Sequence, residues 1–465
     1  MDVKKKYEVA IIGSGITGLV IAFYLKKANI DFIVIEKDCD FGGVMQTRLK
    51  NGYVYEKGPN TGIIAHPEVV ELFEDINDKN CVLEKAQDSV HKRLIYKKKR
   101  WHPLPSTLGE AIGTPLFSLN DKIRMVFEPF RKKGVDPHEN LASMVKRRLG
   151  KSVLRYAVDP FILGIYGGDP EYLVPKYALP KLYELEQEHG SFIRGAINKK
   201  MQKNDPRQNK ATREVFSVRG GFHQLTTALF NLIADDSILF TCDIKKLEPI
   251  KEETGFNLSI YSQENNASYD IQVSHMVTTI GAPELPSLLT FVDKQKLKPL
   301  TDMVYAPIVE VTVGFKEWRG MQLDAFGGLI PSIENRKILG VLFMSSLFQG
   351  RAPICGALLS VFLGGVRNPG IVDEEDEIII KIVKEEIIEL LEIKNFQPDL
   401  FEIHRYPHAI PQYGSDSKER FETINKLQET YPGLLIAGNI KNGIGVADRI
   451  KQGKEVADFL IKKVF

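Results

Sequence analysis

The stretch that decides the fold is Val9–Lys37, which reads VAIIGSGITGLVIAFYLKKANIDFIVIEK. Its four apolar residues Val9–Ile12 are enough for a buried strand, and an apolar helical pattern follows the turn Gly13–Gly18. A second apolar run, Phe32–Ile35, ends at the acidic Glu36. Strand, glycine-rich turn, helix and strand in this order predict a βαβ unit of a parallel sheet.

The three glycines of this turn have the spacing of a dinucleotide-binding fingerprint. Gly13 allows the tight turn, Gly15 lets the backbone approach a pyrophosphate, and Gly18 lets the helix pack closely on the strand. The helix N-terminus faces the phosphates, and Glu36 is placed to accept a hydrogen bond from a ribose hydroxyl. A turn that only packs tightly is the alternative, but the surrounding strand, helix and acid favour nucleotide binding.

The whole chain has the composition of an ordinary globular protein. Its 465 residues are too many for one core, so two or three domains are expected. The 62 basic and 60 acidic residues nearly cancel, which gives no reason to expect a nucleic acid as the partner. The four cysteines form no C-x-x-C pair, so neither a structural metal site nor a disulfide framework is predicted. A reducing, cytoplasmic setting fits best.

No membrane-crossing or secretory segment is predicted from the sequence. The charged start, Met1–Lys6, runs directly into the first strand and leaves no room for the apolar core of a signal peptide. The longest weakly polar run, Ala352–Val366, is shorter than the roughly 18 residues that span a bilayer. Peripheral membrane contact stays open.

A second glycine-rich loop follows the acidic end of the βαβ unit. The pair Gly42-Gly43 lets bare backbone lie against a cofactor where side chains would collide, and Tyr53–Gly62 supplies a further turn. Two ordinary turns are the alternative interpretation. The combination favours a large cofactor.

These features together resemble the flavin amine oxidase superfamily. Four later segments, in the right order and spread over nearly the full chain, narrow the resemblance to the protoporphyrinogen oxidase family of haem biosynthesis. They are Asp159–Pro170 (DPFILGIYGGDP), Glu188–Gly195 (EHGSFIRG), Phe348–Pro353 (FQGRAP) and Ala409–Tyr413 (AIPQY).

The chain departs from the family pattern at three places. Asp40 stands where the family usually has an Arg before the glycine pair, which puts one phosphate contact in doubt. Gly414–Asp416 replaces the usual Gly-His, and Tyr406 replaces the usual Trp. None of these changes removes a group on which the chemistry obviously depends.

The resemblance implies FAD as the cofactor, held by both ends of the chain. A second flavin signature is expected near the C-terminus, where the strand Gly433–Asn439 opens into Gly443–Asp448 and a last helix, Arg449–Phe465. The N-terminus of that helix would stabilise the anion that forms when flavin N5 accepts a hydride. The implied cofactor-binding residues are Gly13, Ser14, Gly15, Ile16, Thr17, Gly18, Glu36, Lys37, Gly42, Gly43, Val44, Met45, Gly58, Pro59, Asn60, Thr61, Ile244, Gly438, Asn439, Ile444, Gly445 and Val446.

The resemblance also implies a set of substrate-binding residues for a tetrapyrrole. Arg93, in a hairpin predicted over His91–Trp101, would pair with a propionate, because a guanidinium can hold a carboxylate bidentately. The cations Lys97–Arg100 read as a solvated turn. Taken singly, the apolar members are more often core residues than ligand contacts. The implied residues are Arg93, Gly164, Leu329, Leu342 and Phe362.

The predicted fold class is α/β, α+β overall, in three parts. Residues 1–66, 212–285 and 400–465 would form a Rossmann-like FAD-binding domain, and residues 67–103 and 286–399 a mixed-sheet substrate domain. Residues 104–211 resemble the family's helical, membrane-associating domain. Its cations Lys122, Arg124, Arg131 and Lys146–Arg148 suit an anionic leaflet, although core packing with a solvated rim explains the same pattern. Lys199–Lys210 reads as an exposed linker.

The implied activity is the six-electron oxidation of a porphyrinogen to a porphyrin, with dioxygen reduced to hydrogen peroxide. The expected substrate is protoporphyrinogen IX, with coproporphyrinogen III as the alternative. No metal site and no catalytic side chain are predicted, because the chemistry belongs to the flavin. We expect a meso hydrogen to leave as hydride to N5, while tautomerisation carries the pyrrole protons to solvent.

Other functions share the same nucleotide-binding features. An amine oxidase or a carotenoid-type desaturase is a more remote enzymatic reading, and a GDP-dissociation-inhibitor-like binding protein is a non-enzymatic one. The second flavin signature argues against the last. The family also suggests handover of the product to ferrochelatase and a cytoplasmic location, with peripheral contact to the membrane.

Overall fold

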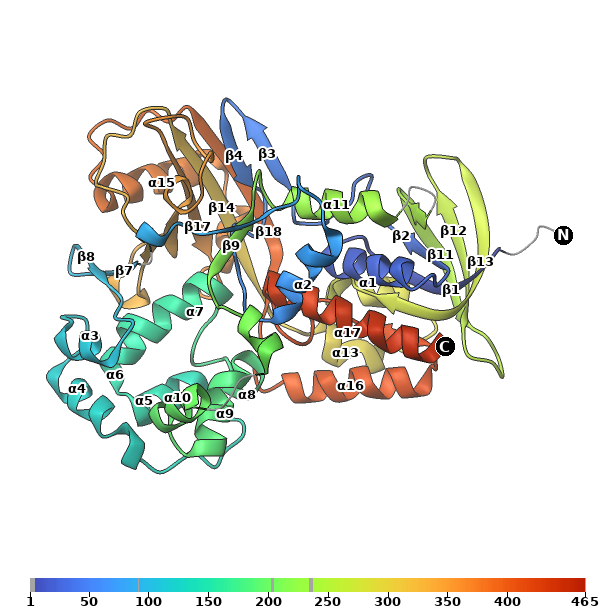
Figure 1. The fold of residues 1–465 in the computed structure, drawn as a ribbon, viewed down its shortest axis with the longest axis horizontal. Helices are drawn as coiled ribbons and strands as arrows, with labels where there is room; N and C mark the ends of the chain where they lie inside the picture. The colour runs from blue at the N-terminus through green and yellow to red at the C-terminus, as the bar shows by residue number, and fades with distance from the viewer. Residues whose placement is uncertain (1–4, 91, 202–204, 234–236, 465) are drawn as a thin grey trace.

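The computed structural model of the chain describes residues 5–90, 92–201, 205–233 and 237–464. His91 of the predicted hairpin, part of the predicted linker Lys199–Lys210, and Phe465 of the last helix lie outside these residues, as do residues 1–4. The fold combines two large sheets with a helical segment, which confirms the predicted mixed α/β class (Figure 1).

The first large sheet is the one predicted from the glycine fingerprint. Five of its strands run parallel, in the order β10-β2-β1-β13-β19, and an antiparallel pair, β12 and β11, continues the sheet from β13. The strands are β1 Lys5–Ile12, β2 Phe32–Ile35, β10 Ile238–Leu239, β11 Cys242–Pro249, β12 Phe256–Ser262, β13 Ala267–Thr278 and β19 Leu434–Ile436.

Helices from both ends of the chain cover this sheet. Helix α1 (Ile16–Lys27) lies beside α17 (Val446–Val464), as Figure 1 shows, and α11 (His223–Ile233) packs on α1. Apolar residues of all three helices share one buried core with the sheet. The N-terminal and C-terminal segments therefore come together in one unit. Helices α12 (Leu285–Leu288), α13 (Lys294–Thr301) and α16 (Ser417–Thr430) share a second core cluster with the other face of the sheet.

Helix α2 (Pro67–Ile76) belongs to this first unit in space. Its apolar residues Val69, Leu72 and Ile76 enter the same core as α1, and the helix packs against α17. The predicted boundary at residue 66 would place α2 in the substrate domain instead. Helix α2 lies between β5 (Gly62–Ile63) and β6 (Leu83–Lys85) in the sequence. Both strands pair with β9 (Val215–Val218), so this small sheet keeps the segment around α2 beside the nucleotide unit.

The second large sheet is mixed and lies beside the first unit. Its order is β18-β14-β17-β16-β15-β7-β8, with only β15 and β7 parallel. One face is covered by α15 (Asp376–Leu390), which buries valine and leucine side chains of the central strands. The strands are β7 Arg93–Lys97, β8 Arg100–Pro103, β14 Tyr305–Phe315, β15 Gly327–Leu329, β16 Gly340–Phe343, β17 Ala357–Gly364 and β18 Leu400–Pro411.

A bridge of smaller elements joins the two units. The hairpin of β3 (Thr47–Lys50) and β4 (Tyr53–Glu56) packs on the second sheet through Tyr53 and Tyr55, near α14 (Met344–Leu347). Glu56 of β4 forms a buried ion pair with Arg351, 2.9 Å between Oε1 and Nη1. The two units are thus tied by both apolar contact and a paired charge.

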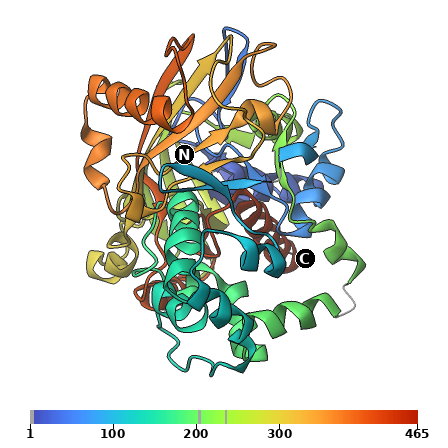
Figure 2. The ribbon, with the colours of Figure 1, turned by 90° about the vertical axis from the view of Figure 1, so that its left-hand side faces the viewer.

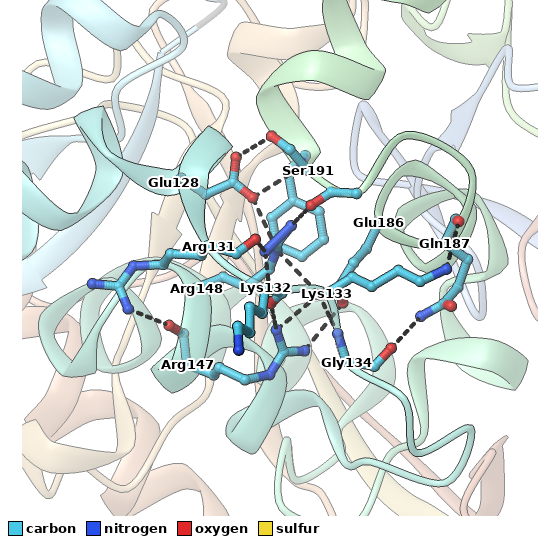
Figure 3. A network of polar contacts seen from close by, with 12 residues as sticks. Glu128, Arg131, Lys132, Lys133, Gly134, Arg147, Arg148, Glu186, Gln187 and Ser191 are labelled. Atoms are coloured by element: carbon cyan, nitrogen blue, oxygen red, sulfur yellow. Dashed lines mark hydrogen bonds and ion pairs between the residues drawn. The ribbon is translucent and has the colours of Figure 1, made fainter.

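The helical segment sits below the second sheet in Figure 2. Figure 3 shows the polar network at its centre, where Arg148 contacts Glu128 at 2.9 Å and Glu186 at 3.3 Å. All three side chains are buried, so this network fixes how the helices pack. The helices are α3 Leu108–Gly113, α4 Leu119–Val126, α5 Leu141–Arg148, α6 Lys151–Val153, α7 Asp159–Tyr166, α8 Pro175–Ala178, α9 Pro180–His189 and α10 Phe192–Met201. Within the residues described, none of the helices is long and apolar enough to cross a membrane.

Candidate active site

The glycine-rich turn has the geometry of a phosphate cradle. Gly13 has φ +101°, and its N–H donates to the carbonyl of Ile35 at 2.9 Å. A Cβ at Gly18 would lie 2.0 Å from the carbonyl oxygen of Gly13, so helix and strand pack as closely as predicted. A Cβ at Gly15 would meet nothing within 4 Å. The space beside Gly15 is therefore open, as an approaching pyrophosphate requires.

The start of helix α1 completes this cradle. Gly15 is the N-cap residue and makes no side-chain cap hydrogen bond, so the first N–H groups of the helix, those of Ile16 and Thr17, are available to a ligand. Free N–H groups at a helix N-terminus attract anions. The expected flavin nucleotide fits here on this ground.

Glu36 is held beside the same turn. Its Oε2 accepts hydrogen bonds from the Ser14 amide at 2.6 Å and the Ser14 hydroxyl at 2.7 Å, and its Oε1 accepts from Asp38 N–H at 3.0 Å. A carboxylate oxygen has more than one lone pair, so these bonds orient the group and leave capacity for a ribose hydroxyl. Lys37 is exposed, 3.9 Å from Glu284.

The second glycine loop lies directly against the first. Gly42 N–H donates to Ser14 O at 2.9 Å, and Gly42 forms a bridge with Gly15. Both Gly42 and Gly43 have positive φ, which other residues rarely adopt. Beyond the pair, Val44 is exposed and Met45 is buried in the nucleotide core.

Ile244 approaches the same region from another strand. It lies in β11, partly buried against the core below the sheet, next to a β-bulge between Ile244 and Lys246. The strand begins where Cys242 N–H donates to Glu36 O at 2.9 Å. Ile244, one of the implied cofactor-binding residues, is thus two positions from the residue whose backbone contacts the predicted ribose-binding acid.

The C-terminal signature closes the site from the other end of the chain. Gly438 N–H donates to Gln452 Oε1 at 2.8 Å, and Asn439 O accepts from Tyr413 OH at 2.7 Å. Ile444 is partly buried against the helical core, and Val446 begins α17.

Asp448 ties this C-terminal loop to the N-terminal half. Its Oδ2 accepts from Gly445 N–H at 3.1 Å, and its Oδ1 lies 2.9 Å from Nε2 of His66. Contacts to Gly445 and His66 lower the pKa of the Asp448 carboxyl, although burial alone would raise it. An ionised Asp448 therefore joins the two segments.

The loop Gly58–Thr61 links the cofactor region to the second sheet. A Cβ at Gly58 would lie 2.1 Å from Val44 O, so this loop packs against the second glycine loop. Pro59 and Thr61 flank the buried Asn60, whose Nδ2 donates to Glu310 at 2.6 Å and to Gly58 O at 3.1 Å. The amide oxygen of Asn60 accepts from Ser360 Oγ at 2.8 Å. These bonds occupy the amide group, so Asn60 anchors the loop to the sheet.

The register of the second sheet brings the predicted substrate residues onto one face. Gly327 pairs with both Arg93 and Leu342, and Leu329 pairs with Gly340, which in turn pairs with Phe362. Paired residues point to the same face of a sheet, and so do residues two apart along one strand. Four side chains from four strands thus share the face opposite α15: Arg93, Leu329, Leu342 and Phe362.

Gly164 meets this face from helix α7. A Cβ at Gly164 would lie 2.4 Å from Cδ2 of Leu329, so no larger residue fits without a shift. The same face carries Glu310 and Ser360, whose side chains hydrogen-bond with Asn60. The predicted cofactor loop and the predicted substrate residues therefore meet on one surface.

Arg93 lies at the edge of this surface without a carboxylate partner in the described part of the chain. Its guanidinium sits 5.2 Å from the ring centre of Phe326, and burial lowers its pKa. Arginine stays charged in proteins, so this guanidinium can bind an anionic group of a ligand.

Glu310 is the site residue that sequence reasoning missed. It is only 2% exposed, and burial raises the pKa of its carboxyl to about 8. The signal was present in Val309–Val313 (VEVTV), where an acid interrupts a strand that has a neighbouring strand on both sides. The alternation of apolar and polar residues predicts that such a residue faces solvent, because the pattern does not show that other elements cover both faces of the sheet at this strand.

Comparisons with known proteins agree with this geometry. A family model described as flavin containing amine oxidoreductase matches residues 16–461. The chain belongs to this family. Membership confirms the expected flavin cofactor, FAD, and the predicted oxidoreductase class.

Individual relatives extend over almost the whole chain. Protoporphyrinogen oxidase 2 of Arabidopsis thaliana is 29% identical and covers 97% of this chain and 93% of its own length. Coproporphyrinogen III oxidase of Bacillus subtilis (strain 168) is 26% identical and covers 99% of both chains. A solved structure from Exiguobacterium sp. 255-15, assigned as a protoporphyrinogen oxidase, has a TM-score of 0.80 at 19% identity over 99% of both chains, which supports the fold.

Proposed function

We propose that this protein oxidises a porphyrinogen to a porphyrin, with protoporphyrinogen IX as the substrate and dioxygen as the final oxidant. The observation that carries the proposal is the full-length similarity to relatives named for that activity. When bound, FAD supplies a hydride acceptor at its N5 atom. The residues of the chain supply binding, orientation and a pocket from which water is excluded.

Three segments would hold the FAD. The turn Gly13–Gly18 would take the pyrophosphate, Glu36 the ribose, and the loop Gly438–Val446 with the start of α17 the pyrimidine edge. This assignment is supported by the open space beside Gly15 and by the contact of Gly42 with Gly15.

The substrate would lie on the face of the second sheet opposite α15. Leu329, Leu342 and Phe362 offer apolar contacts to a flat macrocycle, and Gly164 lets helix α7 pack closely against Leu329 beside them. Arg93 would hold a propionate, because its guanidinium has no ion pair with the described residues and can bind both carboxylate oxygens.

Coproporphyrinogen III is the second candidate substrate. The full-length similarity to the Bacillus subtilis enzyme favours it, and the additional propionates of this substrate would need further cations. Lys92 and Lys97 lie close to Arg93 in sequence; Lys92 is 4.0 Å from Asp324, whereas Lys97 is held by the carbonyl oxygens of Pro115 and Leu116.

Initial rates on both porphyrinogens test this choice. Purified holoprotein is mixed with each substrate in air, and the appearance of porphyrin fluorescence is followed. A higher kcat/KM on protoporphyrinogen IX supports the proposal, whereas a higher value on coproporphyrinogen III supports the alternative. Flavin reduction by amines without porphyrin formation would contradict both.

Membrane contact through the helical segment is part of the proposal. Exposed apolar side chains on α4 have the spacing of one helix face, and others lie on the turn that follows α4 and on α10. Among them, Leu119 is 72% and Phe130 76% exposed. Arg194 lies over the Phe130 ring at 5.6 Å. This apolar patch with nearby cations suits an anionic lipid surface. Its apolar residues are Leu119, Ile123, Val126, Phe127, Phe130, Ile197 and Met201.

Vesicle sedimentation tests the membrane contact. We expect the protein to pellet with vesicles that contain phosphatidylglycerol, and the double variant Ile123→Glu, Phe127→Glu to stay in solution. Ile354→Glu, at a single side chain that is 94% exposed elsewhere, is the matched control and should still pellet. Equal sedimentation of all three proteins contradicts the proposed surface.

We also propose a cytoplasmic location and direct handover of the porphyrin to a ferrochelatase. A flat apolar macrocycle is poorly soluble, so transfer at the membrane surface avoids its release into water. Chemical cross-linking of the two enzymes on vesicles is expected to give a joint product, and its absence contradicts the handover.

A further inference from the structure

Oxidation of a porphyrinogen has a proton balance as well as an electron balance. Each two-electron step removes one hydride from a meso carbon and one proton from a pyrrole N–H, and dioxygen finally receives both equivalents as hydrogen peroxide. Three such steps give the porphyrin once a tautomerisation has moved one hydrogen of the fourth meso carbon, as a proton, to a pyrrole nitrogen. Each proton has to leave the macrocycle, and a titratable group on the face proposed for the substrate can act as its first acceptor.

Glu310 has the position for this task. It lies on β14 directly opposite Phe362 of β17, on the face that carries the proposed substrate residues. Its Oε1 is fixed by the Asn60 amide at 2.6 Å, and no described group donates a hydrogen bond to its Oε2. One carboxyl oxygen is therefore anchored while the other has capacity to take up a proton.

A second titratable side chain lies beside Glu310, toward solvent. His404 of β18 is directly opposite Glu310 in the register, and side chains at such positions start about 4.5–5.5 Å apart. His404 is half-buried, and its Nε2 has no hydrogen-bond partner in the described part of the chain. The ring stacks on Tyr55 at 6.3 Å, close to the exposed pair of Lys50 and Glu402.

We propose that Glu310 accepts the pyrrole proton of each two-electron step and that His404 passes it to solvent. This inference rests on the proposed function and adds a proton acceptor to it. The proton moves from a pyrrole nitrogen to a carboxylate oxygen of Glu310 and then through the neutral imidazole, while the electron pair leaves separately with the hydride.

The electrostatic surroundings support this assignment. Burial raises the pKa of Glu310 to about 8, and the charge of Glu56 acts in the same direction while the Asn60 bond opposes it. A pKa near the working pH lets a group both take up and give back a proton. Burial, with the charges of Lys57 and Arg48, lowers the pKa of His404 against the opposing charge of Glu402, so the imidazole is neutral when Glu310 titrates.

The remaining neighbours of Glu310 do not titrate in this range. Tyr406 donates its hydroxyl to the carbonyl of Lys57, and burial raises its pKa far above neutrality. Ser360 donates to Asn60, and Thr312 carries a neutral hydroxyl. Glu310 is an acceptor only when ionised, so turnover should increase with pH through about 8.

The variant Glu310→Gln tests the role with little change in shape. Its amide oxygen can still accept from Asn60, but the side chain cannot take up a proton. We expect kcat on protoporphyrinogen IX to fall roughly 100-fold, with FAD content and KM close to wild type. The rise in kcat near pH 8 should disappear, and His404→Gln should show a smaller loss.

Two controls separate proton transfer from anchoring. Thr312→Val changes a buried side chain on the same strand and face, and it should leave kcat, its pH profile and FAD content unchanged. Ser360→Ala removes the hydroxyl that donates to Asn60 but leaves the Glu310 carboxyl, so FAD content should fall while the rise in kcat with pH stays. Infrared titration of the holoprotein should show the carbonyl band of a protonated carboxylic acid below pH 8, absent in Glu310→Gln.

Each result decides between the two readings of Glu310. If Glu310→Gln keeps the wild-type kcat and pH profile, or if wild type lacks the infrared band at pH 7, Glu310 only anchors Asn60 and the inference fails. If wild type oxidises neither porphyrinogen, the proposed function itself fails. A porphyrin-forming wild type with an unimpaired Gln variant therefore refutes the proton acceptor alone.

Discussion

The two large sheets contribute different kinds of groups to the site. The nucleotide sheet presents backbone: Gly13–Gly18 and Gly42-Gly43 are contiguous segments that bind by leaving side chains out. The substrate sheet presents side chains, one or two from each of several strands, assembled by pairing between distant segments. A site built from contiguous backbone can therefore be recognised in the sequence as a motif. A site built from side chains of several strands can be recognised only when the pairing of those strands is known.

The largest expected effect is the loss of flavin from a variant that changes only the nucleotide half of the site. Gly15→Val places a branched side chain where the proposed pyrophosphate lies, yet an added Cβ meets no protein atom within 4 Å. We expect a folded but colourless protein, measured as loss of flavin absorbance with an unchanged circular dichroism spectrum.

Gly109→Val is the matched control for that variant. Gly109 lies in helix α3, and its added Cβ also meets nothing within 4 Å, but no nucleotide is expected there. This control should purify with wild-type flavin content. Full flavin content in Gly15→Val would show that the phosphate loop has been placed wrongly.

The junction between the two halves gives the next largest effect. Arg351→Met leaves Glu56 buried without its partner and also removes the bond to Ser217 Oγ at 2.7 Å. Breaking a buried pair from one side costs about 3–5 kcal/mol of unfolding free energy. Chemical denaturation of the variant measures this loss. Arg319→Ala, at an exposed pair with Glu317, should change stability by at most about 1 kcal/mol; equal losses would contradict the role given to the junction.

The smallest of the three effects addresses the substrate half. Arg93→Ala removes a cation that has no ion pair with the residues that the structure describes, so KM for protoporphyrinogen IX should rise roughly 10- to 100-fold, the value of a charged hydrogen bond. FAD content should stay at the wild-type level, because Arg93 is far along the sheet from the Asn60 anchor. Steady-state kinetics and flavin absorbance measure both quantities. An unchanged KM together with lost flavin would refute the assignment.

The nucleotide half was largely predictable from the sequence. The strand Val9–Ile12, the turn and Glu36 follow one another within a short stretch, and local rules describe such elements well. The substrate half was not predictable in this way. Leu342 and Phe362 came from the family resemblance, and Glu310 was missed because its burial depends on strands up to about a hundred residues away.

The structure shows which contacts are made by the residues that depart from the family pattern. Tyr406 places its hydroxyl on the carbonyl of Lys57, so it fastens the chain just before the Asn60 loop. Asp40 accepts from Phe41 N–H at 2.9 Å and shapes the turn before the glycine pair. Asp416 accepts from Arg420 and Tyr172, which joins α16 to the helical segment. None of these roles could be read from sequence spacing.

The most direct test of the account is the stoichiometry of one reaction. Purified flavin-containing protein is given protoporphyrinogen IX in air, and porphyrin and hydrogen peroxide are quantified together. The account predicts three molecules of peroxide for each molecule of protoporphyrin IX. A protein that carries FAD yet leaves both protoporphyrinogen IX and coproporphyrinogen III unoxidised would contradict it.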